Sequence, residues 1–262
     1  MTTSPAMVTE DWSSDEMMTV SAARTLQNGD TCFVGIGIPS TAAILAKATH
    51  APDLILIYES GTIDTHPTRL PLSIGDGELA ETALTVVSIP EIFNYWLQPG
   101  RIKIGFLGAA QVDKFANINT TVIGHSYDKP SVRLPGAGGA PEIAGSCDET
   151  TIICRQSLRT FLEKIDFITS VGFGTGAGSR KEFGLRGKGP TTVITDLGIL
   201  EPDSETCELV FTQIHEGVSV EQVRSKTGWP IKISRNLKVT QPPTEEELQI
   251  LRVLNAPAII KK

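Results

Sequence analysis

The chain has 262 residues, of which 40% are hydrophobic and 20% charged, and its formal net charge is -7 at pH 7. Such a composition is typical of a soluble globular protein, and it excludes the fibrous and disordered classes. The acidic balance argues against nucleic acid or an anionic membrane as the main partner, although a local group of Arg or Lys residues can still bind an anionic substrate.

Two further features concern location and metal binding. The polar start of the chain lacks the basic and then apolar pattern of a signal peptide, and no apolar run approaches the roughly 20 residues that a membrane helix needs. The four cysteines show no metal-ligand or redox spacing, since Cys147 and Cys154 lie seven positions apart. We therefore expect a cytoplasmic protein with reduced thiols and no metal site.

The first expected element is a helix. Residues 1–12 are polar and are predicted to be disordered. A serine or aspartate among residues 13–15 can cap a helix over about 15–27, and Asn28-Gly29 supplies a stop signal. Everything after the disordered start, residues 13–262, is expected to form a single domain.

A strand–helix–strand unit follows. Residues 31–34 are predicted to form a strand, and a turn over 35–40 leads into a helix over about 40–49. The turn resembles a phosphate-binding loop but lacks the full dinucleotide fingerprint, so it also fits a tight turn that only glycine permits. Residues 54–58 form an uninterrupted apolar run, which is typical of a buried parallel strand. The unit predicts an α/β fold with a mostly parallel sheet flanked by helices.

A carboxylate stands directly after that buried strand. Open α/β sheets bind their ligands outside the carboxyl ends of the strands, and Glu59 occupies such a position. A partly desolvated carboxylate costs free energy unless it is paired, hydrogen-bonded or used in chemistry. The residues alone leave two alternatives: Glu59 is a functional group, or it caps the following turn or pairs with a Lys or Arg.

The segment over 61–76 is rich in Thr, Pro and Gly and shows no helical or strand period. Long irregular segments of this kind are often functional. Arg69 lies in this segment, where it can meet a substrate carboxylate or simply neutralise the nearby Asp64 or Asp76.

A helix or irregular connector is expected over 88–97, where the aromatic residues, Phe93 among them, are expected to serve for packing. A strand over 103–107 then leads into a stretch of small residues, which let the backbone approach a ligand closely. Within this stretch Gln111 and Asp113 offer an amide and a carboxylate at a strand end. They can contact a substrate or form a hydrogen-bonded turn.

The second candidate site is a glycine-rich loop made of Gly136, Ala137, Gly138 and Gly139. Consecutive small residues leave backbone N–H groups pointing into a concavity, which can hold an anion. Such a nest can stabilise the oxyanion that forms when a thioester carbonyl is attacked. The alternative is a flexible linker, but prolines on both sides of the loop argue for a defined conformation.

The remaining elements complete the expected scaffold. Thr244 and Glu247 form a capping box that opens a last helix. The other expected elements are strands over 151–154, 167–171, 191–195 and 208–212, and a helix over 218–228.

The stretch Tyr58-Glu59-Ser60-Gly61 resembles the β-subunit signature of class I coenzyme A transferases, most closely the glutaconate and 3-oxoadipate branch. The likeness covers nearly the whole chain after the first dozen residues. Where the family usually has glycine before Asn117, this chain has Ala116, which is disfavoured if the position needs a positive φ. Further matching segments lie at 71–76, 108–113, 117–119, 136–140 and 195–199.

The resemblance implies an activity and roles for the candidate residues. In that family the glutamate at the position of Glu59 is the nucleophile, and the loop over 136–139 forms the oxyanion hole. Coenzyme A then passes between two carboxylic acids through a glutamyl-CoA thioester, with ping-pong kinetics and without a metal or other cofactor. The functional unit implied is an α and a β chain, in a heterotetramer or a larger assembly. The active site lies between the chains, and this chain is the β partner.

The resemblance also favours a substrate pair. Succinyl-CoA and 3-oxoadipate, in aromatic degradation, come first, and glutaconate with acetyl-CoA comes next. The distal carboxylate of such a diacid needs a cation or several N–H donors. Arg69 and Arg133 lie in loops beside the proposed site, but both can instead pair with acidic neighbours. The basic loop over 172–189 can meet the phosphates of coenzyme A, the partner subunit or solvent.

Three rival functions are compatible with the same fold class. The first is an acyl-CoA hydrolase, the second is a lyase or decarboxylase, and the third is a ligand-sensing α/β domain without enzymatic activity. Retention of the Glu59 nucleophile argues against a lyase or decarboxylase, and its retention together with the glycine-rich loop argues against a sensor. Dependence of turnover on an acceptor acid separates a transferase from a hydrolase.

Overall fold

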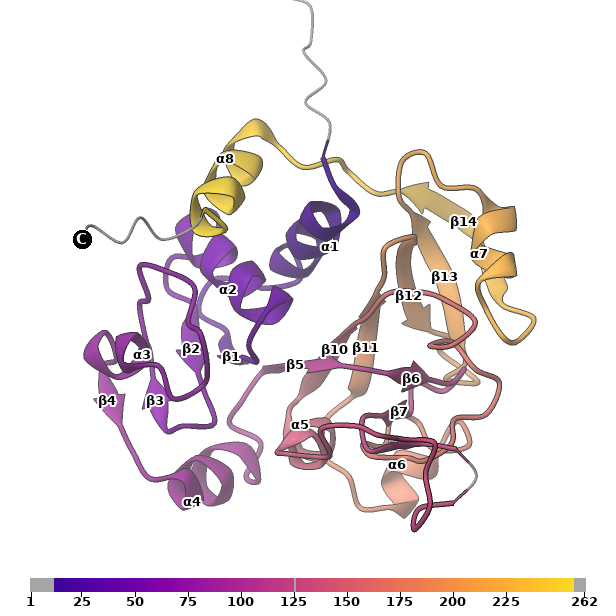
Figure 1. Cartoon of the computed structure of the whole chain (residues 1–262), viewed down its shortest axis with the longest axis horizontal. Coiled ribbons are helices and arrows are strands. Elements are labelled where there is room, and N and C mark those ends of the chain that lie inside the picture. Colours follow the sequence, from indigo (N-terminus) through magenta and orange to yellow (C-terminus); the bar gives the residue numbers. More distant parts are fainter. Residues whose placement is uncertain (1–11, 125, 257–262) are drawn as a thin grey trace, which may run out of the picture.

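The structure is a computed structural model that describes residues 12–124 and 126–256 (Figure 1). Within these residues the helices are α1 (Ser14–Ala23), α2 (Ile38–Ala48), α3 (Gly77–Glu81), α4 (Ile89–Glu91), the π-helix η1 (Ile92–Leu97), α5 (Ala140–Ser146), α6 (Ser179–Glu182), α7 (Val220–Ser225) and α8 (Glu245–Leu254). The strands are β1 (Thr31–Phe33), β2 (Ile55–Ile57), β3 (Thr62–Ile63), β4 (Thr85–Val86), β5 (Ile104–Gly108), β6 (Gln111–Val112), β7 (Ile118–Asn119), β8 (Val122–Ile123), β9 (Val132–Arg133), β10 (Glu149–Ile153), β11 (Gly189–Ile194), β12 (Gly198–Pro202), β13 (Leu209–Ile214) and β14 (Lys232–Val239).

A ten-stranded sheet runs through the molecule in the order β14-β13-β12-β11-β10-β5-β1-β2-β3-β4. Its five central strands, from β11 to β2, are parallel. Antiparallel pairs extend the sheet through β3 and β4 at one edge and through β12 and β13 toward the other, where β14 pairs in parallel with β13. The prediction of a mostly parallel sheet flanked by helices is confirmed.

Strand alternation decides which residues of β1 and β2 face which layer. Leu56 and Tyr58 pack into a buried cluster with α1, α2 and α8, which lie together on one side of the molecule (Figure 1). Phe33 and Ile57 belong to a second cluster, which also contains buried residues of η1 and α5. Because Glu59 lies two positions beyond Ile57, continued alternation directs its side chain toward η1 and α5.

Capping boxes begin the first and last helices. The predicted box at α8 is confirmed, because Thr244 N donates to the Glu247 carboxylate at 2.7 Å and Glu247 N donates to the Thr244 hydroxyl at 3.2 Å. Ser13 and Glu16 make the same pair of bonds at α1. These bonds satisfy N–H groups that the first helical turn leaves free. Arg24 at the end of α1 then pairs with Glu247 at 2.6 Å, which ties α1 to α8.

Several predicted boundaries differ from the structure. The first helix begins close to the predicted start but ends at Ala23, four residues before the expected end at 27. The strand predicted over 167–171 is wrong, because only Ser170 forms an isolated bridge, to Ile118 of β7, and Ile168 is exposed instead of buried. The segment predicted to be disordered lies outside the described residues, apart from residue 12.

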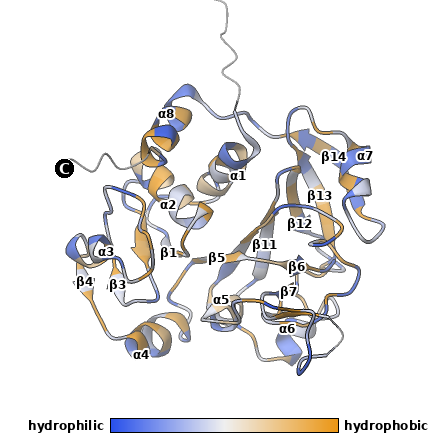
Figure 2. Cartoon of the chain, viewed as in Figure 1, coloured by the Kyte–Doolittle hydropathy of each residue, from blue (hydrophilic) through white to orange (hydrophobic). Residues whose placement is uncertain are grey.

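The edge of the sheet at β4 presents apolar side chains to solvent. Figure 2 shows hydrophobic residues in the central strands and also along the segment that joins β4 to α4 at the outer edge of the molecule. Leu84 and Val86 are 78% and 54% exposed, and Ile89 of α4 is 56% exposed. A soluble monomer rarely leaves such neighbours uncovered, so this edge is a candidate contact surface.

Candidate active site

The Glu59 carboxylate meets the glycine-rich loop. Glu59 follows β2, and its Oε1 atom accepts a hydrogen bond of 2.9 Å from the backbone N–H of Gly139, although the two residues lie 80 positions apart. Gly139 is the N-cap residue of α5, so the bond comes from the positive end of that helix. The two sequence motifs singled out above therefore converge at one place.

A cavity of about 170 Å³ opens at Glu59. Its walls come from the end of β1 and the turn after it, from the glycine-rich loop and α5, and from the irregular segment before α3. The lining residues are Phe33, Val34, Gly35, Glu59, Ile74, Ala137, Gly138, Gly139, Ala140 and Ile143. Glu59 is the one ionisable side chain among them, so a carboxylate stands in an otherwise apolar cavity, where electrostatic interactions are stronger than in water.

The glycine-rich loop has a defined conformation. Gly136 N donates to Thr120 O at 2.9 Å, and the Thr120 hydroxyl donates to Gly136 O at 2.8 Å. Gly136 and Gly138 have φ values of +105° and +50°, which residues with a Cβ rarely adopt. A Cβ on Gly139 would collide with the Glu59 carboxylate. The loop is therefore a shaped wall of the cavity and not a flexible linker.

A hydrogen-bonded chain connects the Glu59 strand end to the turn after β1. The Ser40 hydroxyl donates to Gly35 O at 2.8 Å, so the Tyr58 hydroxyl donates to Ser40 Oγ at 3.2 Å. Burial raises the pKa of Tyr58 to about 12, which keeps this donor protonated. Because Gly35 lines the cavity, this chain positions the wall that faces Glu59. The phosphate-loop alternative for the turn over 35–40 stays a prediction.

Gln111 and Asp113 are engaged inside the protein. The buried Gln111 amide donates to the Asp166 carboxylate at 2.9 Å and accepts from the Asn119 side chain at 2.7 Å. Asp113 accepts bonds from the backbone and side chain of Asn117, and burial raises its pKa. This is the hydrogen-bonded turn weighed above, and their contact with substrate stays a prediction.

The turn that Asp113 organises includes the departure from the family pattern. Ala116 has a φ of +57°, so this position does adopt the conformation that alanine disfavours. The Asn117 side chain ties this turn to a second segment. Its amide nitrogen donates to the Asp113 carboxylate within the turn. Its oxygen accepts from Gly172 N and Gly174 N at 3.0 Å. The turn is thus held by side-chain bonds that offset the backbone strain.

Arg69 and Arg133 both have partners within the chain. Arg69 makes a bidentate pair with Asp76, with N–O distances of 2.7 and 2.9 Å. This guanidinium holds the pKa of Asp76 well below its usual range. Arg133 lies 4.8 Å from the centre of the Tyr127 ring and donates to the Tyr127 carbonyl at 2.9 Å. The Asp76 alternative for Arg69 is confirmed, and a substrate role for either residue stays a prediction.

The basic loop over 172–189 divides between interior and surface. Arg180 is 8% exposed, and its guanidinium donates to the carbonyls of Ala144, Gly172 and Arg186. Ala144 belongs to α5, so Arg180 binds the helix whose N-cap residue, Gly139, donates to Glu59. Lys188 pairs with Glu149 at 2.6 Å near the surface.

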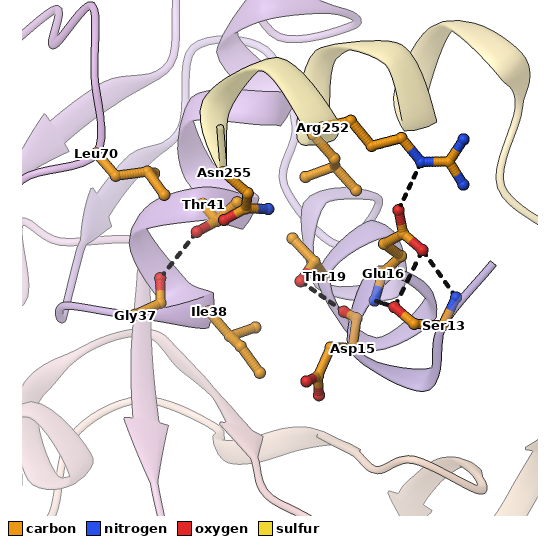
Figure 3. A pocket seen from close by; sticks show the side chains of 11 residues that line it. Ser13, Asp15, Glu16, Thr19, Gly37, Ile38, Thr41, Leu70, Arg252 and Asn255 are labelled. Carbon is orange, nitrogen blue, oxygen red and sulfur yellow. Dashed lines mark hydrogen bonds and ion pairs between the residues drawn. The ribbon is translucent and has the colours of Figure 1, made fainter. Parts of the chain in front are cut away.

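A larger cavity of about 570 Å³ lies between α1, α2 and α8 (Figure 3). Its charged lining residues are already paired: Asp15 with Arg155 at 2.6 Å, and Glu16 with Arg252 at 3.0 Å. None of the residues predicted for catalysis lines this cavity. Gly37 of the turn after β1 does line it, so the turn separates the two cavities.

Sequence reasoning missed the apolar residues that complete the Glu59 site. Phe33, Ile74 and Ile143 line the cavity, and the ring of Phe93 packs against Gly139 beside Glu59. Phe93 therefore lies at the site, and its role is not limited to packing within the connector over 88–97. A signal was available in strand alternation for Phe33, but none pointed to the others.

Metal binding and membrane insertion find no support in the described part of the chain. In residues 12–124 and 126–256 no group of three or more His, Cys, Asp or Glu side chains has an arrangement suited to a metal ion. Over the same residues no helix combines the length and apolar character required to cross a membrane.

Comparisons with known proteins agree with the resemblance. The family model described as coenzyme A transferase matches residues 15–226. A subunit of the 3-oxoadipate CoA-transferase of Pseudomonas knackmussii is 63% identical over 94% of both chains. A subunit of the glutaconate CoA-transferase of Acidaminococcus fermentans is 35% identical over 88% of both. The crystal structure of that glutaconate enzyme superposes with a TM-score of 0.87 at 33% identity, covering 92% of this chain and 94% of the other.

Proposed function

This chain belongs to the coenzyme A transferase family, and we propose that it moves coenzyme A from an acyl-CoA to a free carboxylic acid with Glu59 as the nucleophile. The observation that carries the proposal is the Glu59 carboxylate, held by Gly139 N–H in an apolar cavity whose wall is the glycine-rich loop. The proposed nucleophile and the proposed oxyanion-hole loop thus meet at this cavity, and Glu59 is the one ionisable residue that lines it.

The proposed reaction alternates attack on two carbonyl carbons. A Glu59 oxygen attacks the thioester carbon, and the C–S bond breaks to give a mixed anhydride and the coenzyme A thiolate. The thiolate then attacks the Glu59 carbonyl carbon, and the C–O bond breaks to release the first acid. The result is a glutamyl-CoA thioester, from which the second acid takes coenzyme A by the same steps in reverse.

The position of Gly139 N–H suggests which oxyanion it stabilises. Its partner is Oε1 of Glu59 itself. When the thiolate attacks the Glu59 carbonyl carbon, negative charge develops on a Glu59 oxygen, and this donor is already aimed at it. A preorganised donor of this kind contributes about 3–4 kcal/mol to transition-state stabilisation.

The proposed acid pair is succinyl-CoA and 3-oxoadipate, which the relative at 63% identity supports. The distal carboxylate of a diacid needs cationic or N–H donors. Arg69 and Arg133 are engaged with Asp76 and Tyr127, so the proposed source of those donors is a companion α subunit.

A companion subunit is also supported by the surface around the cavity. Both relatives described above carry the name of one subunit of a larger enzyme. Ile74 at the cavity lies two residues after the exposed Leu72, and Leu84 and Val86 at the β4 edge are exposed as well. The proposed assembly covers this edge with the α subunit, which completes the small open cavity, and the chain by itself is expected to be inactive.

The test is to locate the covalent intermediate. The chain, produced together with its α subunit, is incubated with succinyl-CoA, treated with borohydride to reduce the enzyme thioester, digested and analysed by mass spectrometry. Reduction is expected at Glu59 and nowhere else. The Glu142→Gln variant is the control and should still be reduced at Glu59. Glu142 is a nearby exposed carboxylate in the first turn of α5.

Acceptor dependence completes the test. Consumption of succinyl-CoA is expected to require a free acid, with 3-oxoadipate preferred over acetoacetate. Modification of another residue, or full turnover in Glu59→Ala, contradicts the nucleophile. Consumption that is independent of any acceptor identifies a hydrolase instead.

A further inference from the structure

The ring of Phe93 lies beside Gly139 and the Glu59 carboxylate. A Cβ atom built on Gly139 would lie 2.8 Å from Phe93 Cζ and 3.0 Å from Cε1, and it would also meet Glu59 Oε1. The ring edge and the carboxylate oxygen therefore converge on the same face of Gly139. Phe93 also contacts the cavity residue Phe33, with ring centroids 6.2 Å apart and planes inclined by 59°.

Phe93 belongs to the π-helix η1, which is anchored on both sides. Gln98 N donates to Phe93 O at 2.9 Å, which is the i to i+5 bond of a π-helix. Ile92 and Leu97 at the two ends of η1 are completely buried, while Asn94 is exposed. Phe93 lies between these two buried residues, and its half-buried ring is held beside Gly139.

We propose that Phe93 is a specificity-determining residue that keeps water away from the acylated Glu59 and so favours transfer over hydrolysis. The inference rests on the proposed function and concerns the fate of its covalent intermediate. In hydrolysis a water oxygen would attack the Glu59 thioester carbon and the C–S bond would break. The two water protons would pass to the coenzyme A sulfur and to solvent, and the Glu59 carboxylate would be regenerated.

An aromatic ring suits this position for two physical reasons. Its apolar body occupies space beside Glu59 that water would otherwise fill, and a dry site suppresses attack by water on a reactive intermediate. Its edge carries partial positive charge, whereas its face is negative. The edge atoms Cζ and Cε1 are the ones that approach Gly139, so the ring can lie beside a carboxylate oxygen without repulsion.

The experiment measures how the intermediate partitions. The full chain with its α subunit is assayed for transfer from succinyl-CoA to 3-oxoadipate and, in parallel, for release of free coenzyme A without an acceptor. The variants are Phe93→Ala and Phe93→Leu, with Asn94→Ala as the matched control because it is the next residue of η1 and is exposed. The ratio of hydrolysis to transfer is independent of how much of each preparation is folded.

The ratio is expected to rise about tenfold or more in Phe93→Ala, which corresponds to about 1.4 kcal/mol of relative barrier height. Phe93→Leu is expected to give a smaller rise, because part of the apolar volume is retained, and Asn94→Ala none. The glutamyl-CoA thioester of Phe93→Ala should also decay faster in buffer when followed by mass spectrometry.

Equal loss of both activities in Phe93→Ala, with an unchanged ratio, overturns the inference and assigns Phe93 to structure alone. An equal rise in Asn94→Ala overturns it as well. Failure of the proposed function has a different signature, because the unsubstituted enzyme would then form no thioester at Glu59.

Discussion

The cavity at Glu59 and the larger cavity between α1, α2 and α8 share the turn that follows β1. Gly35 lines the first and Gly37 lines the second. The larger cavity holds about 570 Å³ and the smaller about 170 Å³. In the larger one the acidic groups are neutralised by arginines, as for Asp15 and Arg155. In the smaller one a single carboxylate receives one backbone hydrogen bond.

The difference favours the smaller cavity as the proposed site on the ground of its chemistry, although the other cavity has the larger volume. Surface charges that form ion pairs are stabilised by their partners and by water. A carboxylate in an apolar cavity keeps its reactivity toward an electrophile, because few donors stabilise its charge. Substitutions should therefore lose activity in proportion to their closeness to the small cavity.

The largest effect is expected for Glu59→Gln. Glutamine keeps the shape and can still accept the hydrogen bond from Gly139 N–H, but it lacks the nucleophilic carboxylate. Turnover should fall by about 10³-fold or more. The unfolding midpoint in urea should stay close to that of the unsubstituted protein, and retention of more than a tenth of the turnover would contradict the assignment.

Gly139→Ala is expected to come next. The added Cβ would collide with the Glu59 carboxylate and lie 2.8 Å from the Phe93 ring, so the donor and the nucleophile must separate. Loss of one preorganised donor lowers turnover by about 10²-fold. Gly77→Ala in α3 is the matched control, because its Cβ meets only a flexible glutamate end at 3.8 Å, and it should turn over normally.

The shared turn should respond less. Ser40→Ala removes the hydroxyl that links Tyr58 to Gly35, which leaves a buried Tyr58 hydroxyl without this partner. Unfolding free energy should fall by about 1–3 kcal/mol. Turnover should fall several-fold as the wall facing Glu59 loosens.

The double variant sharpens this prediction. Adding Tyr58→Phe to Ser40→Ala removes the orphaned hydroxyl, so part of the lost unfolding free energy should return. Turnover should stay low, because Gly35 O has still lost its donor. Additive destabilisation of the two substitutions in a denaturant titration would show that the hydroxyls do not act as a pair.

The smallest effect is expected in the larger cavity. Asp15→Asn breaks the pair with Arg155, in which both side chains are 58% exposed. Exposed pairs contribute about 1 kcal/mol or less to stability. Turnover per Michaelis constant for succinyl-CoA should stay within about twofold, and a larger loss would mean that this cavity takes part in substrate binding.

Local sequence patterns alone predicted the strand before Glu59 and the start of the last helix. The unbroken apolar run before Glu59 indicated a buried parallel strand, because strands covered on both faces need no polar alternation. The position of a carboxylate at the end of that strand followed directly. Thr244 and Glu247 indicated a helix start, because a capping box acts over three residues and depends on nothing distant. The resemblance supplied the roles that we propose for Glu59 and for the loop over 136–139.

Tertiary structure alone decided which groups meet. Gly139 reaches Glu59 from 80 positions away, and the ring of Phe93, from the π-helix η1, lies beside both. From the sequence, Arg69 could bind a substrate carboxylate or pair with one of two acidic neighbours. In the fold it forms an ion pair with Asp76. Periodicity and capping are encoded within a few residues, whereas contacts between distant segments depend on how all the layers pack, and no local pattern carries that information.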